Sequence, residues 1–336
     1  MRLSESLRKG IMESKVGGVI NRFKIRSRRS VLFFEDILAN YVRICEENGK
    51  KDDTFMVAKK WATLSTQQLL PKWVNDSSKI LLLNFVTKKI WRNIGLLEYF
   101  NGEMKNDVVH IKTRKEFLTR ILGRNEFMKG FFNGCTDSFF NRRSKIIEYT
   151  QSEQSCNYSL KLEKGFLGIK AKNKDIYNDL NYLPKTEGFT LKDALKMKLF
   201  QLKENNRIYF RGKSITPTEN TIFHILGNEG PLLHKLPHIS RDYFSEVIEK
   251  NTTDEKKLTL LKTLLQIMGW GIVKIIIKNK NVVVSIKNPP YGLQAEEDNW
   301  KFISNVILGY LWLLKENFVI AETSKTEKHL EITYST

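Results

Sequence analysis

The chain has 336 residues, 41% hydrophobic and 28% charged, so it combines enough apolar material for real cores with an ordinary globular charge content. At roughly 100–200 residues per domain, this length favours two domains. No window of about 18 uncharged apolar residues occurs, and residues 1–29 carry charges every few positions. The composition therefore predicts neither a transmembrane helix nor a signal peptide, and we expect a cytoplasmic protein.

The net charge of +19 is unevenly distributed. Residues 1–30 contain nine Lys/Arg and two acidic residues, whereas residues 238–336 contain 13 and 12. A positive field attracts nucleic acid, an acidic protein partner or an anionic membrane surface. The same composition is also typical of a chain in which lysine is simply the default solvated residue, so charge alone leaves both interpretations open.

Hydrophobic periodicity and turn residues predict the first half of the chain. The expected helices cover residues 30–47, 55–70, 80–91 and 117–140. Short extended runs at 95–100 and 108–112 surround a turn that contains Asn101 and Gly102. Two further extended runs, 145–150 and 157–162, close this block.

The second half repeats this order. The expected helices cover residues 191–202, 218–227, 238–250, 253–268 and 298–315, and the expected extended pairs are 207–210 with 213–215, 272–278 with 282–287, and 318–323 with 329–334. Four short segments align in sequence, namely 95–99 with 271–275, 108–112 with 283–287, 131–134 with 306–309, and 147–150 with 320–323.

This order predicts an internal duplication. We therefore expect an α+β chain of two tandem modules, each with helices packed on a small antiparallel sheet. The first domain would cover residues 1–165, with a basic N-terminal arm, and the second residues 166–336.

The second block resembles the 4-vinyl-reductase (hydrocarbon-binding) domain family over roughly residues 190–335. The matching features are an opening strand at 207–212, the sequence LQIMGWG at 265–271, a strand at 282–288 that runs into PPYG at 289–292, a helix containing Gly309, and a closing pair of strands from 321 to 332. The first block is similar but more diverged. It lacks the Trp between two glycines and has Trp91 nearby instead.

The resemblance implies an α+β module related in fold to heme-nitric-oxide sensors and to small subunits of the vesicle-tethering TRAPP complex. It also implies a pocket for a small apolar molecule, frequent homodimerisation, and a role as the sensory part of a regulator. Many members carry two cysteines about eight residues apart in the closing segment, where a metal could bind. Here position 148 is Glu, so Cys156 stands alone, and we expect no metal and no other cofactor.

The sequence contains none of the common catalytic or phosphate-binding motifs, such as GxxxxGK[ST], GxGxxG, HExxH or GxSxG. No Ser/His/Asp or Cys/His set stands out either. We therefore expect a protein that is not an enzyme.

The expected ligand-binding residues are large aromatic side chains next to the predicted hairpins. They are Trp270, Trp300 and Tyr310 in the second block, and Phe117 and Phe131 in the first. Such residues either fill a core or line an apolar cavity, and sequence alone does not separate the two. Our leading hypothesis is a non-enzymatic sensor or scaffold that binds a small apolar ligand and has a regulatory role.

The alternative hypothesis is a basic, nucleic-acid-associated protein that kept the fold and lost the pocket. Its candidate residues are the basic side chains of the N-terminal arm: Arg22, Lys24, Arg26, Arg28 and Arg29. Such side chains contact phosphates, although the same charges also guard the edge strand of a sheet.

Overall fold

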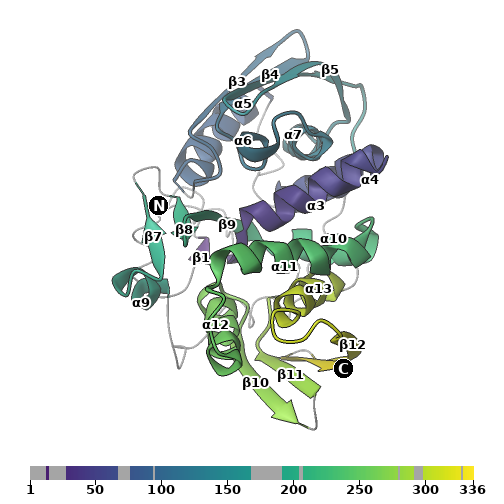
Figure 1. Cartoon of the computed structure of the whole chain (residues 1–336). Helices are drawn as coiled ribbons and strands as arrows, with labels where there is room; N and C mark the ends of the chain where they lie inside the picture. Colours follow the sequence, from purple (N-terminus) through teal and green to yellow (C-terminus); the bar gives the residue numbers. More distant parts are fainter. Residues whose placement is uncertain are drawn as a thin grey trace.

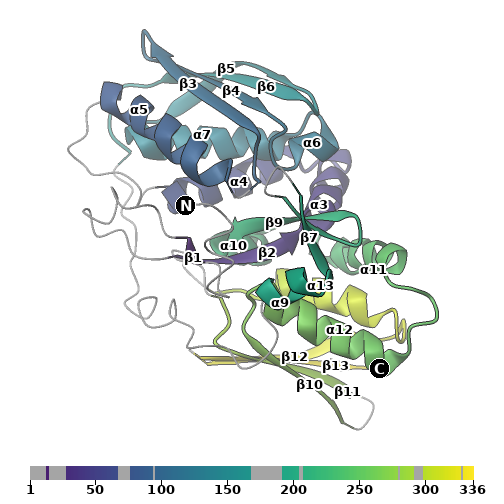
Figure 2. The same cartoon turned by 90° about the vertical axis from the view of Figure 1, so that its left-hand side faces the viewer.

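The computed structural model describes residues 13–14, 28–66, 76–93, 95–167, 191–203, 207–278, 281–290, 298–326 and 328–336. Three antiparallel sheets are arranged along the molecule, one of five strands in the middle and one of four strands at each end (Figures 1 and 2). Helices lie between the central sheet and each end sheet. The predicted α+β architecture of tandem modules is confirmed.

The first module begins with a strand of the central sheet and continues through helices into the sheet of order β3-β4-β6-β5. Its elements are β2 (Arg28–Phe34), α3 (Glu35–Glu47), α4 (Lys51–Thr66), α5 (Asp76–Val86), the π-helical turn η2 (Thr87–Trp91), β3 (Tyr99–Lys105), β4 (Val108–Arg114), α6 (Thr119–Leu122), α7 (Glu126–Phe140), β5 (Ser144–Gln151) and β6 (Ser155–Leu162).

The second module has the same plan, and its end sheet has the equivalent order β10-β11-β13-β12. Its elements are α9 (Leu191–Lys196), β7 (Phe200–Leu202), β8 (Ile208–Phe210), β9 (Lys213–Glu219), α10 (Thr221–Glu229), η3 (Leu233–Lys235), α11 (Leu236–Val247), α12 (Asp254–Ile267), β10 (Ile272–Lys278), β11 (Asn281–Lys287), α13 (Lys301–Leu311), β12 (Val319–Thr326) and β13 (His329–Ser335).

The central sheet joins the two modules. Its order is β1-β2-β9-β8-β7, where β1 is Glu13–Ser14, and the antiparallel pair β2–β9 aligns Ser30 with Glu219 and Phe34 with Ile215. The prediction of a helix from residue 30 was wrong, because the apolar run 31–34 is a buried strand that pairs with β9. Helix α3 starts only at Glu35.

The end sheets share their register and an irregularity. Each has a bulge in its last edge strand, between Ile146 and Glu148 and between Ile320 and Glu322. The hairpin β3–β4 was expected to turn at Asn101 and Gly102. It turns instead at residues 106–107, which both have the positive φ that a tight two-residue turn requires. Tyr99 therefore corresponds to Ile272 and not, as the sequence alignment suggested, to Ile275.

Glycines allow the equivalent helix pairs α4–α7 and α11–α13 to pack closely. A Cβ atom on Gly134 would lie 2.2 Å from the Lys59 carbonyl oxygen, and one on Gly309 would lie 2.1 Å from that of Pro237. These two glycines were aligned correctly from the sequence. The predicted helix 117–140 is interrupted at Gly123, which has φ +67°, and α7 then starts after Asn125, whose side chain accepts a hydrogen bond from the Met128 N–H.

The predicted domain boundary at residues 165/166 remains a prediction, because residues 168–190 lie outside the described part of the chain. Among the helices that the structure describes, none is long and apolar enough to cross a membrane.

Candidate ligand-binding site

An open groove of about 540 Å³ lies at the far end of the second module, between helix α12 and the inner face of the β10–β11 hairpin. The strands contribute Ile275, Ile277 and Val282. The other apolar wall residues are Leu258 of α12 and Leu314 and Phe318, which follow α13. Binding pockets for small molecules usually have volumes of about 300–1,000 Å³ and mainly apolar walls, so this groove has suitable dimensions.

Polar side chains line the rest of the groove. They are Asp254, Glu255, Thr259 and Lys262 of α12, together with Lys315. The Asp254 carboxylate is 3.1 Å from the Lys257 ammonium group and is therefore already paired. An apolar floor with a few polar groups favours a molecule that is apolar over most of its surface.

The equivalent position of the first module has a different residue and a direct helix contact. At the position equivalent to Ile275, strand β3 has Gly102. A Cβ atom there would lie 3.2 Å from Ile80 Cδ1, so α5 packs directly over the glycine. The Asn84 side chain of α5 also accepts from the Gly102 N–H at 2.8 Å and donates to its carbonyl at 2.7 Å. In the second module the Ile275 side chain stands between the strand and α12 instead.

Two of the aromatic residues that the sequence singled out line a different space. Trp270 and Tyr310 line an apolar cavity under the central sheet, together with Phe33 and Phe34 of β2. Its volume is about 20 Å³, which is about the size of one water molecule. The Tyr310 hydroxyl donates to the Lys257 carbonyl oxygen at 2.6 Å. In this structure both residues therefore pack as core.

The other three aromatic residues are buried apart from that cavity. The Trp300 ring lies edge-on to His224, with ring centroids 4.7 Å apart. Phe131 packs against Trp61 with ring centroids 4.9 Å apart, and the buried Phe117 donates its backbone N–H to the Leu96 carbonyl at 2.6 Å. Their role in ligand binding remains a prediction.

The arginines and lysine of the N-terminal arm fall largely outside the structure. Arg22, Lys24 and Arg26 lie outside the described residues. Arg28 and Arg29 belong to β2, where they pair with β1, and their side chains are outside the description.

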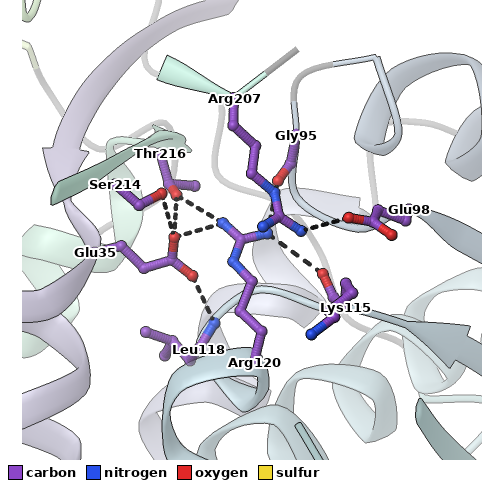
Figure 3. Close-up of polar contacts among 9 residues, drawn as sticks. All are labelled: Glu35, Gly95, Glu98, Lys115, Leu118, Arg120, Arg207, Ser214 and Thr216. Atoms are coloured by element: carbon purple, nitrogen blue, oxygen red, sulfur yellow. Dashed lines mark hydrogen bonds and ion pairs between the residues drawn. The ribbon is translucent and has the colours of Figure 1, made fainter. Parts of the chain in front are cut away.

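A buried polar cluster, which the sequence analysis did not identify, joins the modules (Figure 3). The Glu35 carboxylate pairs with the Arg120 guanidinium and accepts hydrogen bonds from the Leu118 N–H at 3.1 Å, the Ser214 hydroxyl at 2.8 Å and the Thr216 hydroxyl at 3.1 Å. Burial alone would raise the pKa of Glu35. The guanidinium and the hydrogen bonds outweigh that effect and lower it.

A second buried carboxyl group, Glu116, has no cation beside it in the described residues. The Thr113, Thr119 and Tyr158 hydroxyls each donate to it at 2.6 Å. Burial raises the pKa of Glu116, and these hydrogen bonds only partly offset it. No substrate-sized space adjoins this cluster among the cavities described above, so we interpret it as structural.

The cysteines are three separate buried thiols. Burial raises the pKa of Cys45 to about 11 and, together with the neighbouring Glu116, that of Cys156 to about 12. Thiols of this kind are protonated at neutral pH and are poor nucleophiles. Within the described ranges, no group of three or more His, Cys, Asp or Glu side chains is arranged to hold a metal ion.

Comparison with known protein families, with curated proteins and with solved structures finds no match for this chain. The site must therefore be interpreted from its own chemistry.

Proposed function

We propose that this protein is a non-enzymatic binding protein that takes a small, mainly apolar molecule in the groove between α12 and the β10–β11 hairpin. The observation that carries the proposal is the groove itself, about 540 Å³ in volume, with six apolar side chains on its walls. The resemblance of residues 190–335 to the 4-vinyl-reductase domain family supports it, because that family is associated with apolar ligands. We further propose that the chain is a fused pair of such domains, with a sensory or scaffolding role.

The exposure of the groove is itself unusual. Ile277 is 66% exposed, although it lies on the inner face of the sheet, directly opposite the buried Val282. An inner-face isoleucine normally contributes about 1.5–3 kcal/mol when it is fully buried, and most of that contribution is missing here. A ligand that covered Ile277 would supply it.

The test is binding of the neutral fluorophore N-phenyl-1-naphthylamine to the full chain, followed by its fluorescence increase. Thr259 is an exposed residue of the groove, so Thr259→Trp should fill the space without removing a buried group. We expect at least about a tenfold weaker binding, which corresponds to about 1.4 kcal/mol. Lys256→Trp, on an exposed position of the same helix outside the groove, is the matched control and should change binding less than about twofold.

Absence of probe binding to the wild-type chain would refute the proposal. So would equal binding by the two Trp variants, since the probe would then occupy another apolar surface.

A further inference from the structure

The outer face of the first end sheet is the side turned away from the helices, at the top of Figure 2. We call it the first outer face. Its residues alternate with the buried ones along each strand: Tyr99, Asn101, Glu103 and Lys105 of β3, Val108, His110, Lys112 and Arg114 of β4, Lys145, Glu148 and Thr150 of β5, and Ser155, Asn157, Ser159 and Lys161 of β6.

This face is strongly basic, with five Lys/Arg and two Glu. Lys145 stands directly opposite Lys161 on the neighbouring strand, and Lys105 lies in the same row across the sheet. Neighbouring strands are about 4.8 Å apart, so Lys145 and Lys161 lie on adjacent strands and Lys105 lies two strands beyond Lys161, about 10 Å away. Each of these two separations is within about one Debye length at 0.1 M salt. Like charges directly opposite each other destabilise a sheet, and a bound polyanion would remove that repulsion.

Within the described ranges, the lysines of this face have no acidic partners. Among the described residues, no ion pair involves Lys105, Lys112, Lys145 or Lys161. Their charges are therefore available to an external anion.

Aromatic and amide groups adjoin these charges. The Arg114 guanidinium lies over the Tyr99 ring, 5.4 Å from its centroid, and Tyr99 is 39% exposed. In the next row, Lys112 stands between Asn101 and Asn157. Single-stranded nucleic acids bind open antiparallel sheets by stacking bases on aromatic or guanidinium planes, with hydrogen bonds to base edges and cations along the phosphates. An acidic polypeptide would use the cations alone.

The equivalent face of the second end sheet, at the opposite end of the molecule, has a different character. Three lysines there, Lys274, Lys278 and Lys287, stand against Glu322 and Glu331, which leaves a net charge of +1 compared with +3 on the first outer face. Its other outward residues include Ile276 and Val283, and none of its side chains is Phe, Tyr or Trp. The two faces share their backbone geometry and differ in charge, which makes the second face a control.

We propose that the first outer face binds single-stranded nucleic acid, with its phosphates along the row of Lys105, Lys161 and Lys145 and a base stacked at Tyr99 and Arg114. This function is separate from the apolar groove, which lies at the other end of the molecule (Figure 2).

The experiment measures fluorescence anisotropy of labelled 12-nucleotide oligo-U and oligo-dT with the full chain at 50 and 200 mM salt. The test variant is Lys112→Glu with Lys161→Glu, which leaves the core untouched and places a carboxylate opposite Lys145. The control variant is Lys274→Glu with Lys278→Glu, which makes the same change of net charge on the second face. Circular dichroism melting verifies that both variants are folded.

We expect the test variant to bind at least about tenfold more weakly, with a flatter salt dependence, and the control variant to change binding less than about twofold. Tyr99→Ala should weaken binding about fivefold or more while the salt dependence stays, since it removes a stacking surface for a base and no charge. The proposal is overturned if both double variants bind alike, if the wild-type chain binds neither oligonucleotide at 50 mM salt, or if polyglutamate of equal charge competes as well as oligo-U.

Discussion

Replacement of Arg120 by Met tests the buried cluster between the modules. The Arg120 side chain is 6% exposed and the Glu35 side chain 0%, so the variant leaves a carboxylate buried without its cation. It also removes donors to the Gly95 carbonyl at 2.8 Å and the Lys115 carbonyl at 3.3 Å. Loss of one partner from a buried ion pair costs about 3–5 kcal/mol, and we expect a decrease of that size in the free energy of unfolding at pH 7.

The pH dependence separates charge burial from lost packing. In the wild-type chain the pKa of Glu35 is lowered, so its contribution to stability is present above the unfolded value of 4.5 and is lost as the pH falls through the folded value. In Arg120→Met, burial dominates and the carboxyl binds a proton more readily. The difference between the two proteins should therefore shrink as the pH is lowered from 7 to 4.

Urea unfolding followed by circular dichroism measures these differences. The double variant Glu35→Gln with Arg120→Met carries no buried charge and should recover about half of the loss, because removal of both charges is far less costly than removal of one. Arg241→Met is the exposed control, since Arg241 and its partner Glu316 are 38% and 69% exposed, and it should cost less than about 1 kcal/mol. A loss below about 1 kcal/mol for Arg120→Met, or a difference that does not change with pH, would refute the reasoning.

Three further substitutions test the packing and the second carboxyl group. Gly309→Ala places a Cβ atom 2.1 Å from the Pro237 carbonyl oxygen and should cost about 1–3 kcal/mol in urea unfolding; an unchanged midpoint would contradict the close packing of α11 and α13. Tyr310→Ala should lower the free energy of unfolding by about 3–5 kcal/mol, because the ring lines a cavity of only about 20 Å³ and packs as core. A much smaller loss would indicate that the ring lines a larger, ligand-sized cavity. Glu116→Gln should become more stable relative to the wild type as the pH rises above 4.5, because a raised pKa means that stability is lost with increasing pH; parallel pH profiles would contradict the raised pKa.

Much of the fold could be predicted from local patterns. Strand β11 alternates buried and less buried residues along its length, and this period of two follows directly from a sheet with one covered face. Strand β2 was missed because both of its faces are buried between the modules, so residues 31–34 form a continuous apolar run without alternation. Such a run does not distinguish a strand from a helix.

The candidate sites depend on contacts that no local pattern reveals. Glu35 and Arg120 are 85 residues apart, and Ser214 is 179 residues from Glu35. In sequence, Glu35 is only one charged residue of the helix expected over 30–47. The structure places it in the first turn of α3, a position that acidic residues favour for other reasons. One local feature of the sequence points to the groove, namely the three consecutive isoleucines 275–277. A strand with one solvated face normally has a polar residue at every second position, and this run does not.

The duplicated plan explains why the two proposed functions lie at opposite ends of the chain. The centre is constrained, because β2 must pair with β9 and the Glu35 cluster draws on both modules. Figure 2 shows the helices of each module on the inner face of its end sheet, so residues of the outer faces can change without loss of the core. The inner faces also differ at one equivalent position, where Gly102 packs under α5 and Ile275 lines the groove. Exchange of the outward-facing lysines between the end sheets should therefore weaken salt-dependent oligo-U binding in the anisotropy assay and leave probe binding in the groove unchanged.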